Sequence, residues 1–240
     1  MVAHGNKVPQ IDELTILFHR KLAARLLEWA CGYPESSSVS ENHPRYQVVT
    51  EGRDVGAMQD KYSSCGDLPH WLLWRLGVRL PWVNRAEGPG DWRIGQNTIL
   101  LQAEGKFPKG YYGACPVAQV WRGQSLDAGD TLLISRTDHS GVHAVCVVAA
   151  HDALLNTAQY GQPGGALVDC RITTGERLCT VCEDGSLSHG RIIRCVLRLP
   201  DVLRAALQRR QLVACQAPPP AIDLSEQPTQ PGTPGAKLLR

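Results

Sequence analysis

Apolar side chains recur every three or four positions from Ile11 to Ala30, and this spacing predicts an amphipathic helix. Asp12 and Glu13 stand in its first turn, where the helix dipole favours negative charge. Gly32 and Pro34 interrupt the pattern and end the helix. Because polar residues occupy the other positions, we expect this helix to pack on the outside of the core.

A second apolar run, from Leu68 to Leu76, follows residues that commonly open a helix. Ser63, Ser64 and Asp67 are N-cap or first-turn residue types. Gly77 is the residue type that most often follows a helix end. The sequence therefore predicts a short, buried helix that ends at Gly77.

After Leu126 the periodicity changes from helical to strand-like. Three apolar runs are separated by short turns, which is typical of an antiparallel meander. These predicted strands are 131–135, 142–150 and 153–160. Shorter strands are expected at 166–174, 178–183 and 191–199, and a closing helix at 202–212. The pattern predicts an α+β fold in which N-terminal helices pack on an antiparallel β-meander.

A length of 240 residues accommodates one domain with a sizeable core. We place this domain at residues 1–217, with residues 1–60 as an N-terminal helical extension. Residues 218–240 are rich in Pro, Gln, Thr, Ser and Gly, so they bury little apolar surface and are predicted to be a disordered tail. The net charge of +2 gives no electrostatic footprint for nucleic acid or an anionic membrane, and neither is expected as a partner.

The first 30 residues mix charged and apolar side chains, and no run of about 18 apolar residues occurs. The sequence thus predicts neither a secretory signal nor a membrane span. Nine cysteines, an odd number and widely scattered, suit a reducing compartment. We expect synthesis in the cytoplasm, and leave open export or release by other machinery.

Cys65 stands at the entrance of the predicted 68–76 helix. The helix dipole and the unpaired amide groups of the first turn favour a thiolate there, and the thiolate is the nucleophilic form of cysteine. Cys65 is therefore the candidate nucleophile. The alternative is a buried thiol that packs as a small hydrophobic side chain.

A cysteine nucleophile needs a base to take its proton and, usually, a third group to orient that base. His143 opens the valine-rich strand and is the predicted base; His139, in the preceding turn, is held less firmly. Gln159, one strand later, is the predicted orienting group, with Asn156 second. Strand alternation places Thr157 and Gln159 on one face and Asn156 on the other. Each of these residues also fits as an ordinary polar strand residue.

Two short motifs follow the cysteine in a specific order. The first is a Gly-Asp that opens a strand, and the second is a histidine that opens the next strand. They read Ala128-Gly129-Asp130-Thr131-Leu132-Leu133 and Gly141-Val142-His143-Ala144-Val145. With the polar residue one strand later, this order resembles that of the NlpC-like and CHAP cysteine peptidases and amidases. The resemblance covers about Tyr62 to Gly165.

The resemblance implies a papain-like fold with Cys65 as nucleophile, His143 as base and Gln159 in the third position. It also implies hydrolysis of an amide bond in peptidoglycan peptides or another peptide substrate, without a metal or organic cofactor. Relatives include deamidases and acyltransferases. The chain departs from the family in two ways: the segment between Cys65 and Gly129 is long, and no second domain for wall binding is evident.

Three other interpretations remain. Cys179 and Cys182 form one CxxC pair with Cys170, His189 and Cys195 around it, but structural zinc sites usually show two paired spacings, so ordinary hairpin cysteines explain the pattern better. A non-catalytic binding or structural protein can keep the same fold. A toxin or deamidase that other machinery delivers to a different location can use the same triad.

Overall fold

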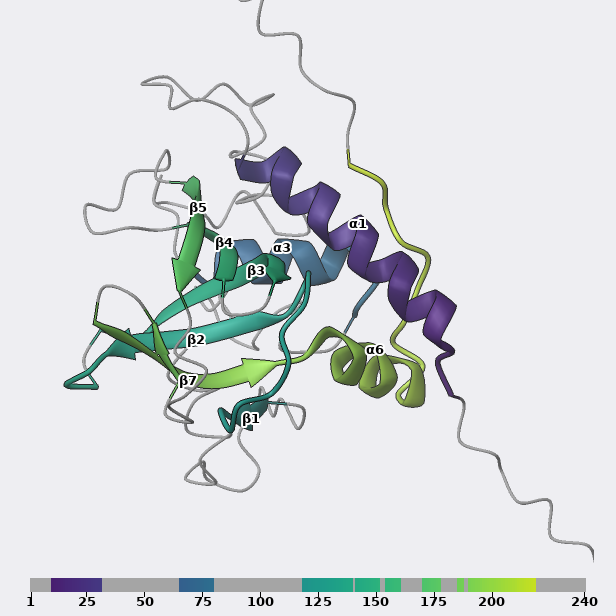
Figure 1. Cartoon of the computed structure of the whole chain (residues 1–240). Helices are drawn as coiled ribbons and strands as arrows, with labels where there is room; N and C mark the ends of the chain where they lie inside the picture. The colour runs from purple at the N-terminus through teal and green to yellow at the C-terminus, as the bar shows by residue number, and fades with distance from the viewer. Residues whose placement is uncertain are drawn as a thin grey trace, which may run out of the picture.

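The computed structural model describes residues 10–31, 65–79, 118–139, 141–151, 154–160, 170–177, 185–187 and 190–218. Its helices are α1 (Glu13–Cys31), α3 (Asp67–Arg75) and α6 (Leu199–Gln208). Its strands are β1 (Ala118–Val120), β2 (Thr131–Arg136), β3 (His143–His151), β4 (Leu154–Tyr160), β5 (Cys170–Arg177), β6 (Ser186–Leu187) and β7 (Arg191–Leu197). The described part of the chain is thus an α+β structure with one sheet (Figure 1).

The strands pair antiparallel in the order β1-β7-β2-β3-β4-β5, and β6 joins β7 at the side. The predicted meander is confirmed from β2 to β4 and continues into β5. The last long strand, β7, does not extend the meander at β5. It returns to the other side of β2, where Leu132 pairs with Val196.

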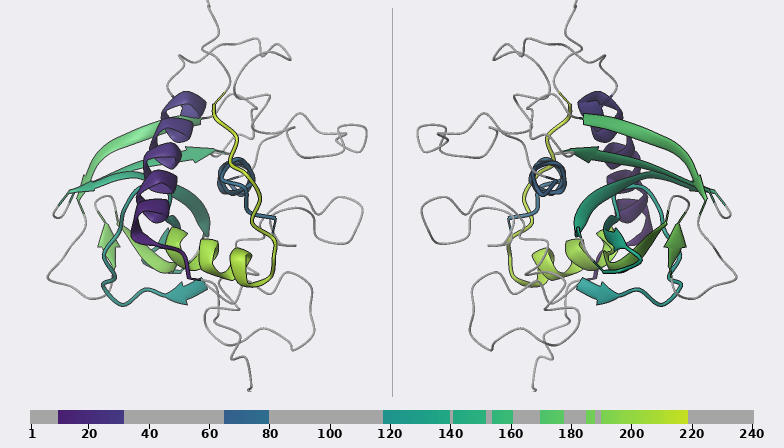
Figure 2. Two further views of the ribbon diagram at one scale, coloured as in Figure 1. Left: turned by 90° about the vertical axis from the view of Figure 1, so that its right-hand side faces the viewer. Right: turned by 90° about the vertical axis from the view of Figure 1, so that its left-hand side faces the viewer.

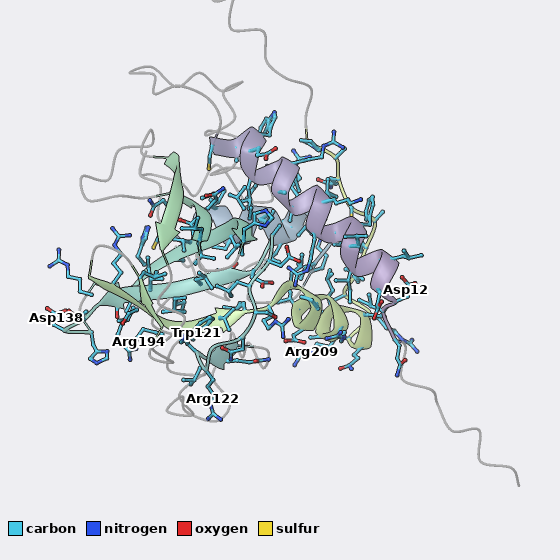
Figure 3. The ribbon with its side chains drawn as sticks, in the orientation of Figure 1. Asp12, Trp121, Arg122, Asp138, Arg194 and Arg209 are labelled. Carbon is cyan, nitrogen blue, oxygen red and sulfur yellow. The ribbon has the colours of Figure 1, made fainter. Side chains whose placement is uncertain are left out.

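Side chains alternate between two buried layers, one on each face of the sheet. The helix face packs against α1, α3 and α6 and includes Leu133, Ala144, Cys146, Ala158 and Cys195. The far face is covered by Trp121 and Leu187 and includes Leu132, Ile134, Val145, Val147 and Val196. Figure 3 shows Trp121 near β7 and β1, away from α1. Both faces are apolar, so the sheet is a central layer with a core on each side.

Helix α1 begins at an Asp12 cap. The Asp12 carboxylate accepts a hydrogen bond from the Thr15 N–H at 2.7 Å, and its carbonyl accepts the Ile16 N–H at 3.1 Å. Leu26 and Leu27 are fully buried on the helix face, whereas Leu14 near the first turn is 79% exposed. The predicted amphipathic helix is confirmed, and its buried side is part of the same core as the sheet.

Helix α3 follows Gly66 at the N-cap position, and Asp67 is its first residue. Its end is a Schellman motif: the Gly77 N–H donates to the Trp74 carbonyl at 3.0 Å and the Val78 N–H to the Leu73 carbonyl at 2.9 Å. Gly77 has φ +81°, the left-handed conformation that this motif requires. The predicted helix and its glycine stop are therefore confirmed.

A buried carboxylate joins the start of β2 to two helices. Asp130 accepts hydrogen bonds from the Leu199 N–H at 2.8 Å, the Asp127 N–H at 3.0 Å and the Arg20 guanidinium at 3.3 Å. Because Asp130 caps the first amide of α6 and Pro200 fits a helical first turn, this helix begins at Leu199 and not at the predicted Val202.

Residues 211–217 run antiparallel to residues 75–79 and form what we call the C-terminal strap. The Arg79 N–H donates to the Gln211 carbonyl at 2.8 Å, and the Val213 N–H donates to the Gly77 carbonyl at 2.9 Å. Figure 2 shows the strap, in yellow-green, passing beside α3 and α1. The strap thus covers the C-terminal end of α3.

Several predictions lie outside the described residues. These are the capping residues Ser63 and Ser64, the strand at 178–183 and the tail from residue 219 onward. Among the described helices, none combines the length and apolarity needed to cross a bilayer.

Gly77→Ala is expected to destabilise the protein by about 2 kcal/mol or more. A Cβ at Gly77 would overlap the Val213 carbonyl oxygen as well as strain the backbone. Gly141→Ala is the matched control, because Gly141 has φ +64° but open space around it, and should cost about 1 kcal/mol. Urea unfolding of both variants measures the difference; equal costs would contradict a tight contact between α3 and the strap.

Asp130→Asn is expected to lower the free energy of unfolding by about 2 kcal/mol near pH 7, because an amide NH₂ replaces one acceptor oxygen among three donors. The exposed Glu28→Gln should change it by less than about 0.5 kcal/mol. Burial raises the pKa of Asp130 from 3.8, with the Arg20 charge acting in the opposite direction.

This raised pKa of Asp130 determines whether the stability of the fold rises or falls with pH. The folded state holds the Asp130 proton more tightly than the unfolded state, so this group destabilises the fold as the pH rises from 3.8 through the folded pKa. The stability difference between the parent and Asp130→Asn should therefore widen at lower pH. A difference that narrows on acidification, in urea unfolding at two pH values, would contradict this sign.

Candidate functional site

The structure brings together two of the three predicted site residues. His143 is the first residue of β3 and Gln159 lies in β4, and His143 Nε2 is 3.0 Å from Gln159 Oε1. Since Oε1 only accepts, the imidazole donates from Nε2, and a neutral ring then has its lone pair at Nδ1. Gln159 is 2% exposed and His143 is half-buried. A histidine oriented in this way can act as a base at Nδ1.

The register of the sheet explains this contact. Cys146 of β3 pairs with Ala158 of β4, so Gln159 lies diagonally across from His143 on the same face. Alternation places Asn156 on the opposite face of β4, which leaves it away from the imidazole. Thr157 shares the face of Gln159, is 1% exposed, and its hydroxyl makes no hydrogen bond within the described part of the chain.

Cys65 lies immediately before the N-cap of α3. Its side chain is 6% exposed and belongs to the layer that contains Ala144 and Cys146. Helix α3 packs against β3 and β4, as Figure 1 shows behind the labels of these strands. The candidate nucleophile is therefore a buried thiol at a helix start on the helix face.

The His143–Gln159 pair lies on the other face of the sheet. His143 alternates with Ala144 of the helix face, and its cross-strand partner is Ile134 of the far face. Gln159 likewise alternates with Ala158 of the helix face. Cys65 thus belongs to the helix face, and strand alternation assigns its predicted base to the far face.

The Gly-Asp motif has a structural explanation. Gly129 has φ +85°, and a Cβ there would lie 2.7 Å from Leu199 Cδ2 and 2.9 Å from Ala23 Cβ. Asp130 anchors Arg20 and the start of α6. Glycine permits close packing against both helices, and the aspartate fixes their ends, so this motif positions the helices against the sheet.

Two of the cysteines named in the zinc interpretation lie in described strands that are not neighbours in the sheet, β5 and β7. Cys195 is fully buried on the helix face, and Cys170 lies in β5. Cys179, Cys182 and His189 lie outside the described residues. Within the described ranges, no three His, Cys, Asp or Glu side chains are grouped as metal ligands.

One close pairing of a thiol and an imidazole was not expected from the sequence. Cys215 Sγ lies 3.2 Å from His19 Nε2, across a separation of 196 residues. The sequence also gives no indication of a role for His70, which lies in α3 and is 1% exposed. No local motif marks these residues, because the strap that carries Cys215 meets α1 only through tertiary packing.

Comparisons of this chain with protein-family models, with curated proteins and with solved structures found no match.

Cys146 is expected to resist alkylation in the folded protein. Burial raises the pKa of this thiol to about 12, which leaves roughly one thiolate in ten thousand at about pH 8. Peptide mapping after iodoacetamide treatment should show no labelling of Cys146 until the protein is unfolded in guanidinium chloride. Labelling of folded Cys146 as fast as a free thiol would contradict its burial.

Proposed function

We propose that the chain is a cysteine hydrolase of papain-like fold that cleaves an amide bond in a peptidoglycan peptide or another peptide substrate. The observation that carries the proposal is the 3.0 Å pair of His143 and Gln159 on the strands against which the Cys65 helix packs. An amide that orients a histidine is the third element of several cysteine hydrolases.

In the proposed reaction, the Cys65 thiolate attacks the substrate carbonyl and forms an acyl-enzyme. The first N–H groups of α3, those of Asp67 and Leu68, have no intrahelical acceptor by helix geometry, so they are the candidate oxyanion donors. His143 takes the thiol proton, gives it to the leaving amine, and then activates the water that releases the acyl group. These steps use no metal and no organic cofactor.

The proposal makes one geometric demand. His143 must present Nδ1 to Cys65, although alternation assigns it to the far face together with Val145 and Val147. His143 is the first residue of β3 and comes two residues after Gly141, which has φ +64°. Of the β3 residues, it is therefore the nearest to this end of the strand, where a side chain can reach from one face of the sheet to the other.

A second candidate function is a non-catalytic binding or structural protein on the same fold. The observation that favours it is the placement of Cys65 and His143 on different faces of the sheet. A deamidase or acyltransferase would use the same three residues as the hydrolase and differ in the acceptor of the acyl group.

The test is the pH dependence of Cys65 alkylation, followed by peptide mapping in a Cys215→Ser background that removes the more exposed thiol. We expect Cys65 to react with an apparent pKa below the free value of about 8.5. His143→Ala should abolish this advantage, and Gln159→Leu should weaken it. His139→Ala, in an exposed turn, is the matched control and should change nothing.

An activated Cys65 would then be tested on peptidoglycan fragments and on peptide amides, with Cys65→Ala as the inactive reference. A Cys65 that is inert, or that reacts equally with and without His143, would overturn the hydrolase and leave the binding protein as the better account.

A further inference from the structure

The C-terminal strap is tied to both α1 and α3. Besides its backbone pairing with residues 77–79, the Gln216 N–H donates to the Arg75 carbonyl at 2.8 Å, and the Arg75 guanidinium donates to the Ala217 carbonyl at 3.0 Å. Cys215 lies between these contacts, with Sγ 3.5 Å from the Leu76 carbonyl and 3.2 Å from His19 Nε2. Its side chain is thus the point at which the strap meets α1.

The protonation of the His19–Cys215 pair follows from its neighbours. His19 Nδ1 lies 2.7 Å from the Thr15 carbonyl oxygen. Because a carbonyl only accepts, Nδ1 carries a hydrogen, and the lone pair of a neutral ring is then at Nε2. The Cys215 thiol has one hydrogen, and it can donate this hydrogen either to His19 Nε2 or to the Leu76 carbonyl. Burial raises the pKa of Cys215.

Exposure separates Cys215 from the four other cysteines whose side chains the structure describes. Cys31, Cys65, Cys146 and Cys195 are buried, whereas Cys215 is half-buried between exposed residues on either side. Its base, His19, is 5% exposed and held by Thr15. A reagent can thus reach the sulfur while the imidazole stays fixed behind it.

We propose that Cys215 and His19 form a thiol modification site for small disulfides of the glutathione class. His19 Nε2 accepts the thiol proton as Sγ attacks one sulfur of the disulfide. The S–S bond breaks, a mixed disulfide forms at Cys215, and the other half leaves as a thiolate that takes up a proton. The oxidant is the disulfide itself, so no further reactant is needed.

The adduct has a structural consequence. A sulfur that carries a tripeptide cannot keep its contacts with both His19 and the Leu76 carbonyl, so the strap leaves the end of α3. This releases the Val213 and Gln216 amides from the Gly77 and Arg75 carbonyls. Modification of Cys215 therefore also controls whether the strap stays bound to α3, the helix that begins beside Cys65. The proposal stands independently of the hydrolase, because it uses neither Cys65 nor His143.

The experiment treats the reduced full chain with glutathione disulfide near neutral pH and follows the Cys215 peptide by mass spectrometry. We expect a mixed disulfide at Cys215 that forms about a hundredfold more slowly in His19→Gln, the low end of general-base assistance. His151→Gln, at an exposed histidine of β3, is the matched control and should leave the rate unchanged. Cys215→Ser should give no adduct in this peptide.

A second measurement does not depend on how the His19 variants fold. Hydrogen–deuterium exchange of the parent should show faster exchange at the Val213 and Gln216 amides after modification. His19→Phe, which keeps a ring without a base, replaces His19→Gln if the latter does not fold. No adduct at Cys215, an equal rate in a folded His19 variant, or unchanged exchange after modification would each overturn the proposal. Cys65 alkylation in the Cys215→Ser background reports on the hydrolase separately.

Discussion

The Asp130 carboxylate holds the helices in place on the sheet. It is fully buried and accepts from Arg20 of α1, from the first amide of α6 and from the turn that leads into β2. Arg20 also donates to the Ala128 carbonyl at 2.9 Å and pairs with Asp127 at 3.1 Å, so its charge is neutralised although it is 9% exposed. A buried charge is tolerated only when it is paired in this way. The position of α1 and the start of α6 therefore both depend on one residue of β2's leading turn.

Local patterns were sufficient for α1, for α3 and for the meander, because hairpins and helix ends are set by neighbouring residues. The start of α1, the Gly77 stop and the order β2-β3-β4 follow from short-range signals. Short-range signals did not predict the pairing of β7 with β2 or the start of α6 at Leu199, since both depend on contacts between distant segments. The strap was missed for the same reason.

The candidate site shows a different limit of sequence reasoning. Alternation predicts that Gln159 and Asn156 lie on opposite faces of β4, and the structure brings Gln159 to His143. It could not say which face the helices cover. In β3 the odd and even positions are both apolar, for example Ala144 and Val145, so the binary pattern carries no face signal. The position of Cys65 relative to His143 depends on tertiary packing, and the hydrophobic pattern does not predict it.

The strap also sets an order of events while the chain is being made. Arg75 and Ala217 are 142 residues apart, which at about 5–20 residues per second corresponds to roughly 7–28 s of synthesis. The residues of α3 are therefore synthesised long before the segment that covers the C-terminal end of this helix. Throughout this interval the residues around Leu76 and Val78, fully buried in the finished protein, lack the segment that shields them. The nascent chain therefore carries a transient apolar site of the kind that chaperones bind.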